Sequence, residues 1–232
     1  MASSEEPNLK RIYTARSSGE APALDSAFDA GAWAGVDALQ VDSFHPKSSE
    51  HRPLVCAKVL YDESTIYVHF QVRDRYVICV HNEYQGPVCR DSCAEFFVRP
   101  KQEKGYFNFE VNCGGHLLLS YIEDHTRTPD GFKKFTRISW DEASQIRIFH
   151  SMSGRVFPEI KEDVVWRIAY AVPFSLFEKY IGSLGAVRGQ EWRANFFKCA
   201  DDCSHPHWAS WAPIGEELNF HQPRFFGVLR LG

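Results

Sequence analysis

Two acidic residues stand on the polar faces of two neighbouring strand-like runs, where their carboxylates could act together. Residues 93–98 place Glu95 opposite the apolar side chains of one run, and residues 106–112 place Glu110 on the polar face of the next. Two carboxyl groups about 5–10 Å apart can hydrolyse a glycosidic bond. Because the polar face of any sandwich commonly carries Glu, this pair is equally consistent with a binding surface.

A second cluster combines soft metal ligands in the segment 199–207: Cys199, Cys203, His205 and His207. Thiolate and imidazole groups are typical zinc ligands, and four of them can close a structural site. The C-x3-C-x-H-x-H spacing is not a standard one, and Pro206 restricts how the two histidines converge. We therefore predict that this segment binds no zinc. The pair formed by Cys89 and Cys93 is a weaker metal candidate.

Aromatic residues in loop-like segments indicate a ligand with flat apolar faces. The chain contains six Trp and nine Tyr, more than a core of this size needs. Four aromatic residues stand in such segments: Tyr84, Trp208, Trp211 and Phe220. A pyranose has apolar C–H patches on its faces and hydroxyls around its edge, so aromatic rings can cover the faces while polar side chains bind the edge. This combination favours a sugar site.

The elements that must position these side chains are strands. Apolar residues at every second position predict strands at residues 54–60, 65–72, 93–98, 106–112, 116–121, 145–150, 164–172, 191–198 and 225–231. Only residues 173–180, opened by Pro173, suggest a helix. The pattern predicts an all-β fold, namely an antiparallel β-sandwich of the immunoglobulin-like or jelly-roll-like kind with one or two short helices.

The chain shows no linker that would divide it into domains. We expect residues 1–22 to be a flexible N-terminal lead-in and residues 23–232 to form a single β-sandwich domain. Residues 122–142 are rich in polar and charged side chains and are expected to form a long loop.

Composition excludes several classes of function. The formal net charge of −4 at pH 7 argues against a nucleic-acid partner, and no apolar run reaches the ~18–20 residues that span a membrane.

The N-terminus has no signal-peptide pattern, so we expect a cytoplasmic protein, or a secreted one if a leader has been removed. Seven Cys, an odd number, favour free thiols in a reducing compartment. No common nucleotide-binding, serine-hydrolase or zinc-protease motif is present.

From about residue 24 to 231, the order and spacing of several motifs resemble family 9 carbohydrate-binding modules, as found in bacteria. The matching segments are residues 32–33, 57–62, 66–70, 91–97, 106–112, 170–174, 194–199, 207–214 and 220–227. The resemblance implies a β-sandwich in which two aromatic rings enclose a terminal sugar of a glucan or xylan chain. It also implies structural calcium, whose ligands follow no linear motif.

The resemblance carries individual residues into the expected sugar site. It places the family's site Glu at Glu95 and its site Asn at Asn112. The first aromatic ring falls on Tyr84, and the second on Phe220 or Trp211. The chain departs from the family at Glu110, where members have Arg.

We therefore expect non-catalytic carbohydrate binding that supports polysaccharide catabolism, without catalytic residues. The expected partners are an oligo- or polysaccharide and an associated glycoside hydrolase. The alternatives are a glycoside hydrolase that uses Glu95 and Glu110, and a haem-carrying sandwich of the DOMON type with Met152. Glu95 is expected to be ionised and to face the rim of the site. The predicted carbohydrate-binding set is Tyr84, Arg90, Glu95, Glu110, Asn112, Asn195, Lys198, Trp211, Phe220 and His221.

Overall fold

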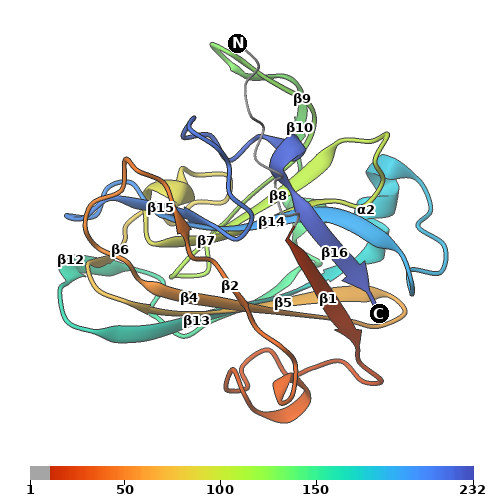
Figure 1. Cartoon of the computed structure of the whole chain (residues 1–232), viewed down its shortest axis with the longest axis horizontal. Helices are drawn as coiled ribbons and strands as arrows, with labels where there is room; N and C mark the ends of the chain where they lie inside the picture. Colours follow the sequence, from red (N-terminus) through yellow and green to blue (C-terminus); the bar gives the residue numbers. More distant parts are fainter. Residues whose placement is uncertain (1–10) are drawn as a thin grey trace, which may run out of the picture.

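Alternating apolar and polar side chains form two facing β-sheets in the computed structural model, which describes residues 11–232 (Figure 1). The first, called the β8 sheet, runs in the order β10 (Gly131–Arg137), β9 (Leu117–Thr128), β8 (Tyr106–Asn112), β7 (Cys93–Arg99), β14 (Glu191–Ala200) and β16 (Gly227–Leu231). The second, the β5 sheet, runs in the order β4 (Leu54–Tyr61), β5 (Thr65–Asp74), β13 (Val164–Pro173) and β11 (Arg147–His150). The predicted antiparallel β-sandwich is confirmed.

One strand joins the two layers. Residues 12–15 of β1 (Ile12–Ser17) pair in parallel with β16, and residues 16–17 pair in parallel with β4. The expectation that residues 1–22 form a flexible lead-in is therefore wrong for this strand, while residues 1–10 lie outside the described residues. The sequence signal is weak because only Tyr13 and Ala15 of β1 are buried.

Short elements complete the sandwich. The remaining strands are β2 (Leu39–Gln40), β3 (Ser43–Phe44), β6 (Val77–Cys79), β12 (Val156–Ile160) and β15 (His207–Ser210). Two short α-helices agree with the expectation, α1 (Trp140–Ala143) and α2 (Phe174–Ile181), the second with Pro173 at its N-cap. Three 3₁₀ turns are η1 (Gly31–Trp33), η2 (Val88–Arg90) and η3 (Pro223–Phe225). No helix in residues 11–232 has the length and apolarity needed to cross a membrane.

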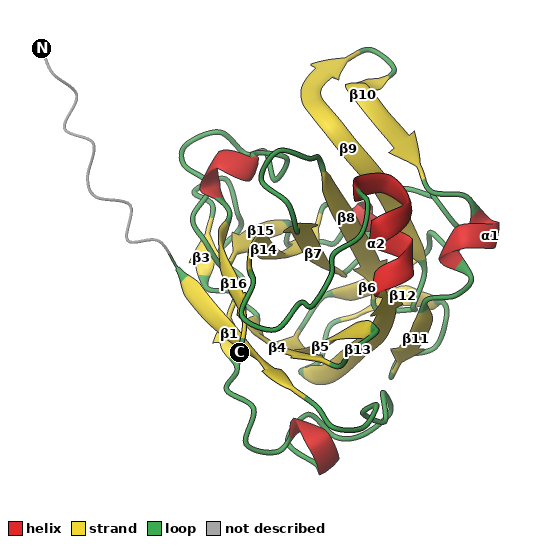
Figure 2. Cartoon of the chain, turned by 90° about the vertical axis from the view of Figure 1, so that its right-hand side faces the viewer, coloured by secondary structure: helices red, strands yellow, loops and turns green. Residues whose placement is uncertain are grey.

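The long polar segment at residues 122–142 is largely a hairpin and not the loop that was expected. Strands β9 and β10 pair through a turn formed by Pro129 and Asp130. The hairpin extends beyond the body of the sandwich (Figure 2), where most of its side chains are exposed. Because both faces of the hairpin meet water, the apolar alternation that reveals a half-buried strand is missing.

The core lies between the two sheets and is rich in aromatic rings. Phe196 of β14 approaches Phe70 of β5 with ring centroids 6.0 Å apart, and Phe109 of β8 approaches Tyr170 of β13 at 6.1 Å. Leu229 of β16 is fully buried in the same cluster. These contacts fix which face of each β8-sheet strand points inward, because side chains alternate along a strand.

Truncation of one buried and one exposed leucine should have very different effects on the free energy of unfolding. Leu229→Ala should lower the free energy of unfolding by about 2–5 kcal/mol, because it leaves a cavity in the core. Leu54→Ala, at a position 56% exposed at the start of β4, should change it by less than about 0.5 kcal/mol. Urea denaturation of both variants measures the difference, and equal losses would show that Leu229 does not belong to the core.

Candidate functional site

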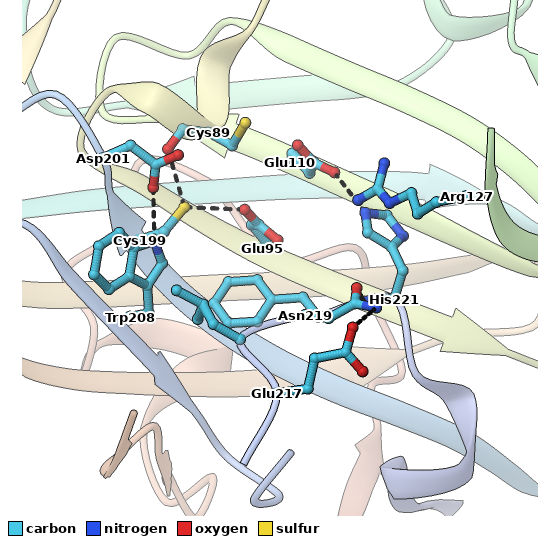
Figure 3. Close-up of a pocket in the computed structure, with 12 residues that line it drawn as sticks. Cys89, Glu95, Glu110, Arg127, Cys199, Asp201, Trp208, Glu217, Asn219 and His221 are labelled. Atoms are coloured by element: carbon cyan, nitrogen blue, oxygen red, sulfur yellow. Dashed lines mark hydrogen bonds and ion pairs between the residues drawn. The ribbon is translucent and has the colours of Figure 1, made fainter. Parts of the chain in front are cut away.

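A cavity of about 400 Å³ lies over the outer face of the β8 sheet (Figure 3). Strands β7, β8 and β14 form its floor, and the segment 217–221 and the loop after β14 form its walls. The cavity is lined by Cys89, Glu95, Glu110, Arg127, Cys199, Asp201, Trp208, Glu217, Leu218, Asn219, Phe220 and His221. Four of the ten residues predicted from the sequence are among them: Glu95, Glu110, Phe220 and His221.

The register of three strands builds the floor. Glu95 of β7 lies directly opposite Glu110 of β8 and opposite Phe197 of β14. The neighbouring residues Ala94 and Phe96 point into the core, so Glu95 and Glu110 must point away from it. The expected strand parity is therefore correct for both acids.

Glu95 does not face the rim as expected, because it lies deep in the cavity. Its side chain is 2% exposed, and its Oε1 atom lies 3.1 Å from the Cys199 Sγ atom, which donates to it. Burial, and secondly the nearby Glu110, raise the pKa of Glu95 well above its usual value. Glu95 therefore holds a proton more readily than an exposed carboxyl would, in contrast to the expected ionised group at the rim.

Glu110 is also buried but has more polar support. Asn108 Nδ2 donates to Glu110 Oε1 at 2.8 Å. Burial raises the pKa of Glu110 to about 7, while the Asn108 hydrogen bond and the positive charge of Arg127 act in the opposite direction. The His221 ring lies 4.0 Å away, and burial, with Arg127, lowers the pKa of His221 to about 3. His221 is therefore neutral beside this acid at neutral pH.

Two aromatic side chains stand in the walls. Phe220 stacks on Phe197 with ring centroids 4.2 Å apart and planes 13° apart, which leaves its other face and its edge for the cavity. Trp208 of β15 is half-buried, and its indole N–H donates to Asp201 Oδ1 at 2.7 Å. Both rings have one side fixed by protein contacts, so they offer rigid apolar surface to a ligand.

The other two predicted aromatic residues lie elsewhere. Tyr84 lines a separate cavity with Trp140, and its hydroxyl donates to the Ile138 carbonyl at 2.6 Å. Trp211 is buried in the core against Phe196. The predicted clamp between Tyr84 and Phe220 or Trp211 is therefore not formed.

Three predicted polar residues are engaged in the fold near the cavity rather than in it. Asn112 shares the outward face of β8, but its amide donates to Asp91 and to the His81 carbonyl, both at under 3 Å. Arg90 forms an exposed ion pair with Asp202. Asn195 exchanges hydrogen bonds with the backbone of residue 212. None of the three side chains lines the cavity, because each is engaged by partners in its own part of the fold.

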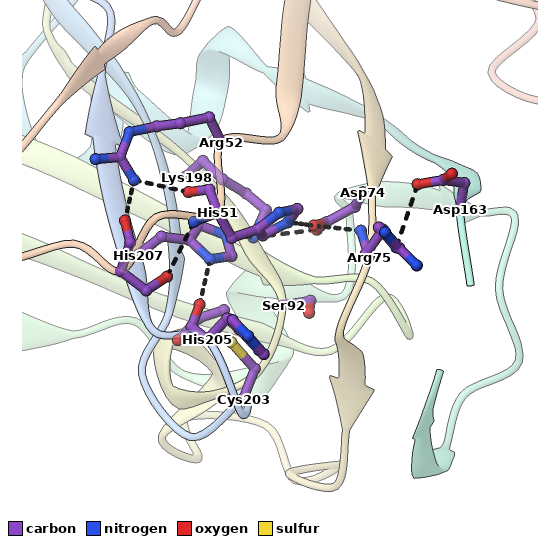
Figure 4. A network of polar contacts seen from close by, with 12 residues as sticks. His51, Arg52, Asp74, Arg75, Ser92, Asp163, Lys198, Cys203, His205 and His207 are labelled. Carbon is purple, nitrogen blue, oxygen red and sulfur yellow. Dashed lines mark hydrogen bonds and ion pairs between the residues drawn. The ribbon is translucent and has the colours of Figure 1, made fainter. Parts of the chain in front are cut away.

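Lys198 lies on the opposite side of β14, inside the sandwich (Figure 4). Its Nζ atom is 3.4 Å from Asp74 Oδ2 and 2.8 Å from His207 Nε2, and the side chain is fully buried. Burial alone would raise the pKa of Asp74, but Lys198 and the hydrogen bond from His51 outweigh it and hold that pKa well below its usual value. Lys198 therefore neutralises an interior carboxylate and does not reach the cavity.

The four ligand-like side chains of the segment 199–207 do not converge on one point. Cys199 contacts Glu95, while Cys203 Sγ points to the Ala200 carbonyl. The His205 ring stacks on Tyr76 at 3.7 Å, and His207 contacts Lys198. Because these four side chains diverge, they do not form a zinc site with one another.

Several cavity residues were not predicted from the sequence. Trp208 was visible as a loop aromatic but was not selected. Arg127 was hidden in the segment that was expected to be a loop, and Cys89 and Cys199 were weighed only as metal ligands. Asp201, Glu217, Leu218 and Asn219 carry no motif, and only the folding of their loops over β14 brings them to the site.

Comparisons with known proteins agree with this architecture. The family model described as carbohydrate-binding family 9 matches residues 27–231. A crystal structure of a candidate carbohydrate-binding protein from Bacteroides uniformis ATCC 8492 is similar, with 27% identity and a TM-score of 0.82, over 96% of this chain and 100% of that one. A search of the curated proteins gives no match.

Two more distant structures share the fold. Both are family 9 carbohydrate-binding modules from Caldicellulosiruptor kristjanssonii. The one in complex with glucose is 14% identical, with a TM-score of 0.61 over 96% of each chain. The one in complex with cellotriose is 12% identical, with a TM-score of 0.64 over 95% of this chain and 93% of that one. Because the family model matches nearly the whole chain, the protein belongs to carbohydrate-binding family 9, a family of non-catalytic carbohydrate-binding proteins.

Proposed function

We propose that the cavity over β7, β8 and β14 is the carbohydrate site and that it takes a short oligosaccharide or the end of a polysaccharide chain. The observation that carries this proposal is the pairing of Phe220 and Trp208 with a floor of acids in one cavity. A volume of about 400 Å³ is in the lower part of the ~300–1,000 Å³ range of small-molecule sites. A cavity of this size suits a chain end better than the flank of a long polymer.

The cavity supplies the two kinds of contact that a sugar needs. Phe220 and Trp208 offer apolar surface to the C–H faces of a pyranose. Glu110, Asn219 and Arg127 line the same space, so the hydroxyls at the edge of the sugar can find both hydrogen-bond donors and acceptors. The ring that was expected at Tyr84 is supplied instead by Trp208 from β15.

Binding accounts for the two central acids better than hydrolysis does. Glycosidases place their two carboxyl groups on either side of the scissile bond. Glu95 and Glu110 instead stand side by side on adjacent strands of one floor, so both would meet the same side of a bound sugar. The arrangement gives no support to the hydrolase alternative.

The wider setting of the protein is part of this proposal. An associated glycoside hydrolase and a role in polysaccharide catabolism rest on the family alone. All seven cysteines are free thiols, which supports a reducing compartment such as the cytoplasm. Structural calcium stays a prediction, since calcium takes 6–8 oxygen ligands and the one close metal-ligand cluster in residues 11–232 contains two sulfurs.

Removal of the Trp208 ring from the cavity wall should weaken sugar binding without unfolding the protein. Trp208→Ala should lower affinity by roughly 5–150-fold, because stacking on an aromatic ring contributes about 1–3 kcal/mol. Tyr84→Ala, in the separate cavity, is the matched control and should bind as the parent does. A glycan array that includes glucose and cellotriose selects the ligand, and calorimetry measures its affinity. Loss of affinity in the Tyr84 variant alone would place the site elsewhere.

Sugar affinity should also depend on pH through Glu110. Since the pKa of Glu110 is about 7, its carboxyl is protonated below that pH and ionised above it. An ionised acceptor makes a stronger hydrogen bond to a hydroxyl, so affinity should rise by about 5-fold between about pH 6 and about pH 8. Calorimetry across this range measures the rise, and Glu110→Gln should flatten it. An unchanged slope in that variant would assign the titration to another group.

A further inference from the structure

Two cysteine thiols lie at the floor of the cavity, and the proposed contacts to a sugar use neither of them. Cys93 of β7 and Cys199 of β14 are register partners, and Glu95 follows Cys93 on the same face of β7. The two sulfurs and a carboxylate oxygen of Glu95 all lie within 4.8 Å of one another. Among residues 11–232, no other group of three His, Cys, Asp or Glu side chains comes as close. Figure 3 shows the Cys199 sulfur directed at Glu95.

The electrostatics of the cavity favour a cation. Four carboxyl groups line it, from Glu95, Glu110, Asp201 and Glu217, while Arg127 is the one Lys or Arg among the lining residues. Burial raises the pKa of Cys93 to about 12, and it also raises the pKa of Cys199 and Glu95 above their usual values. These shifts share one cause, because an uncompensated negative charge is costly in a buried site, and a bound cation would compensate it.

We propose that Cys93, Glu95 and Cys199 bind a zinc ion at the floor of the cavity. Zinc takes thiolate and carboxylate ligands in a tetrahedron, with Zn–S distances of about 2.3 Å and Zn–O distances of about 2.0–2.2 Å. These lengths put the ligand atoms roughly 3.5–3.8 Å apart. A pair at the 4.8 Å limit would have to close by about 1.0–1.3 Å, whereas Cys199 Sγ and Glu95 Oε1, 3.1 Å apart, would have to move slightly apart. Calcium and magnesium prefer oxygen ligands, so the two sulfurs select zinc over them.

The site has an entry path and an open position. Glu95 and Cys199 line the cavity, whereas Cys93 lies beneath them and is fully buried. Three protein ligands leave one tetrahedral position, which water or a ligand hydroxyl can fill from the cavity. This site uses Cys199 but neither Cys203 nor the two histidines of the segment 199–207, so it replaces the expectation that no residue of that segment binds zinc.

Zinc binding must displace the protons that the buried groups carry. Loss of both thiol protons to solvent gives two thiolates beside the Glu95 carboxylate around Zn²⁺. The affinity for zinc should therefore rise steeply with pH.

A metal titration of the full chain, reduced and free of sugar, tests the proposal independently of carbohydrate binding. The wild type should bind one Zn²⁺ per chain against a chromophoric chelator, and Co²⁺ should give a thiolate-to-metal charge-transfer band. Cys199→Ser and Glu95→Gln should each weaken zinc binding by at least about 10–100-fold, since loss of a ligand costs no less than loss of its supporting partner.

Cys203→Ser is the matched control, because Cys203 is a buried thiol in the same segment that donates to the Ala200 carbonyl and lies outside the cluster. It should bind zinc as the wild type does, and thermal melts confirm that each variant is folded. Absence of a thiolate-to-cobalt band in the wild type would overturn the proposal without any variant. Loss of zinc in Cys203→Ser equal to that in Cys199→Ser would also overturn it, in favour of the loop.

Discussion

The burial of Phe96 between two other rings is the contact on which the site depends. Its ring centroid lies 4.9 Å from Phe196 on β14 and 6.2 Å from Phe109 on β8, so three adjacent strands are held in one register. A slip of one residue in β7 would turn Phe96 to the outer face and Glu95 into the core. The positions of Glu95 and Glu110 on the cavity floor therefore follow from aromatic packing on the other face of the same sheet.

Buried ionisable groups on the two faces of β14 have opposite surroundings. On the inner face, Lys198 meets Asp74, and its positive charge helps to hold the pKa of Asp74 well below its usual value. On the outer face, burial and the nearby Glu110 raise the pKa of Glu95 well above its usual value. The inner pair is complete within the chain and contributes to the fold. The outer cluster is neutral only while protonated, and this imbalance makes the cavity suited to a ligand that supplies donors or positive charge.

Asp91 illustrates how a motif shared with a family can be structural. It is fully buried and accepts hydrogen bonds from the backbone N–H groups of residues 80 and 81 and from Asn112. These bonds hold the η2 segment against the end of β8, which places Cys89 at the edge of the cavity. Asn112 therefore shapes the site through this loop and does not need to touch the sugar.

The sequence by itself determined the local features of this protein. Alternation along residues 93–98 and 106–112 was enough to place Glu95 and Glu110 on one face of neighbouring strands, and the motif order was enough to indicate the family. Strand periodicity is a local property, so it can be seen in a single chain. The hairpin of β9 and β10 was missed because both its faces are solvated, and β1 was missed because only two of its side chains are buried.

Only the tertiary structure decided which candidates meet. Tyr84 and Trp208 are both aromatic residues in irregular or short elements. In the folded chain, however, the Tyr84 hydroxyl donates to the Ile138 carbonyl away from the cavity, whereas Trp208 lines the cavity. The burial of Glu95 could not be predicted from the sequence either. Its position on β7 is compatible with an exposed rim, but the loops over β14 bury its side chain and thereby raise its pKa. Such outcomes depend on contacts between residues far apart in the chain, and a local pattern does not encode how distant segments fold over one another.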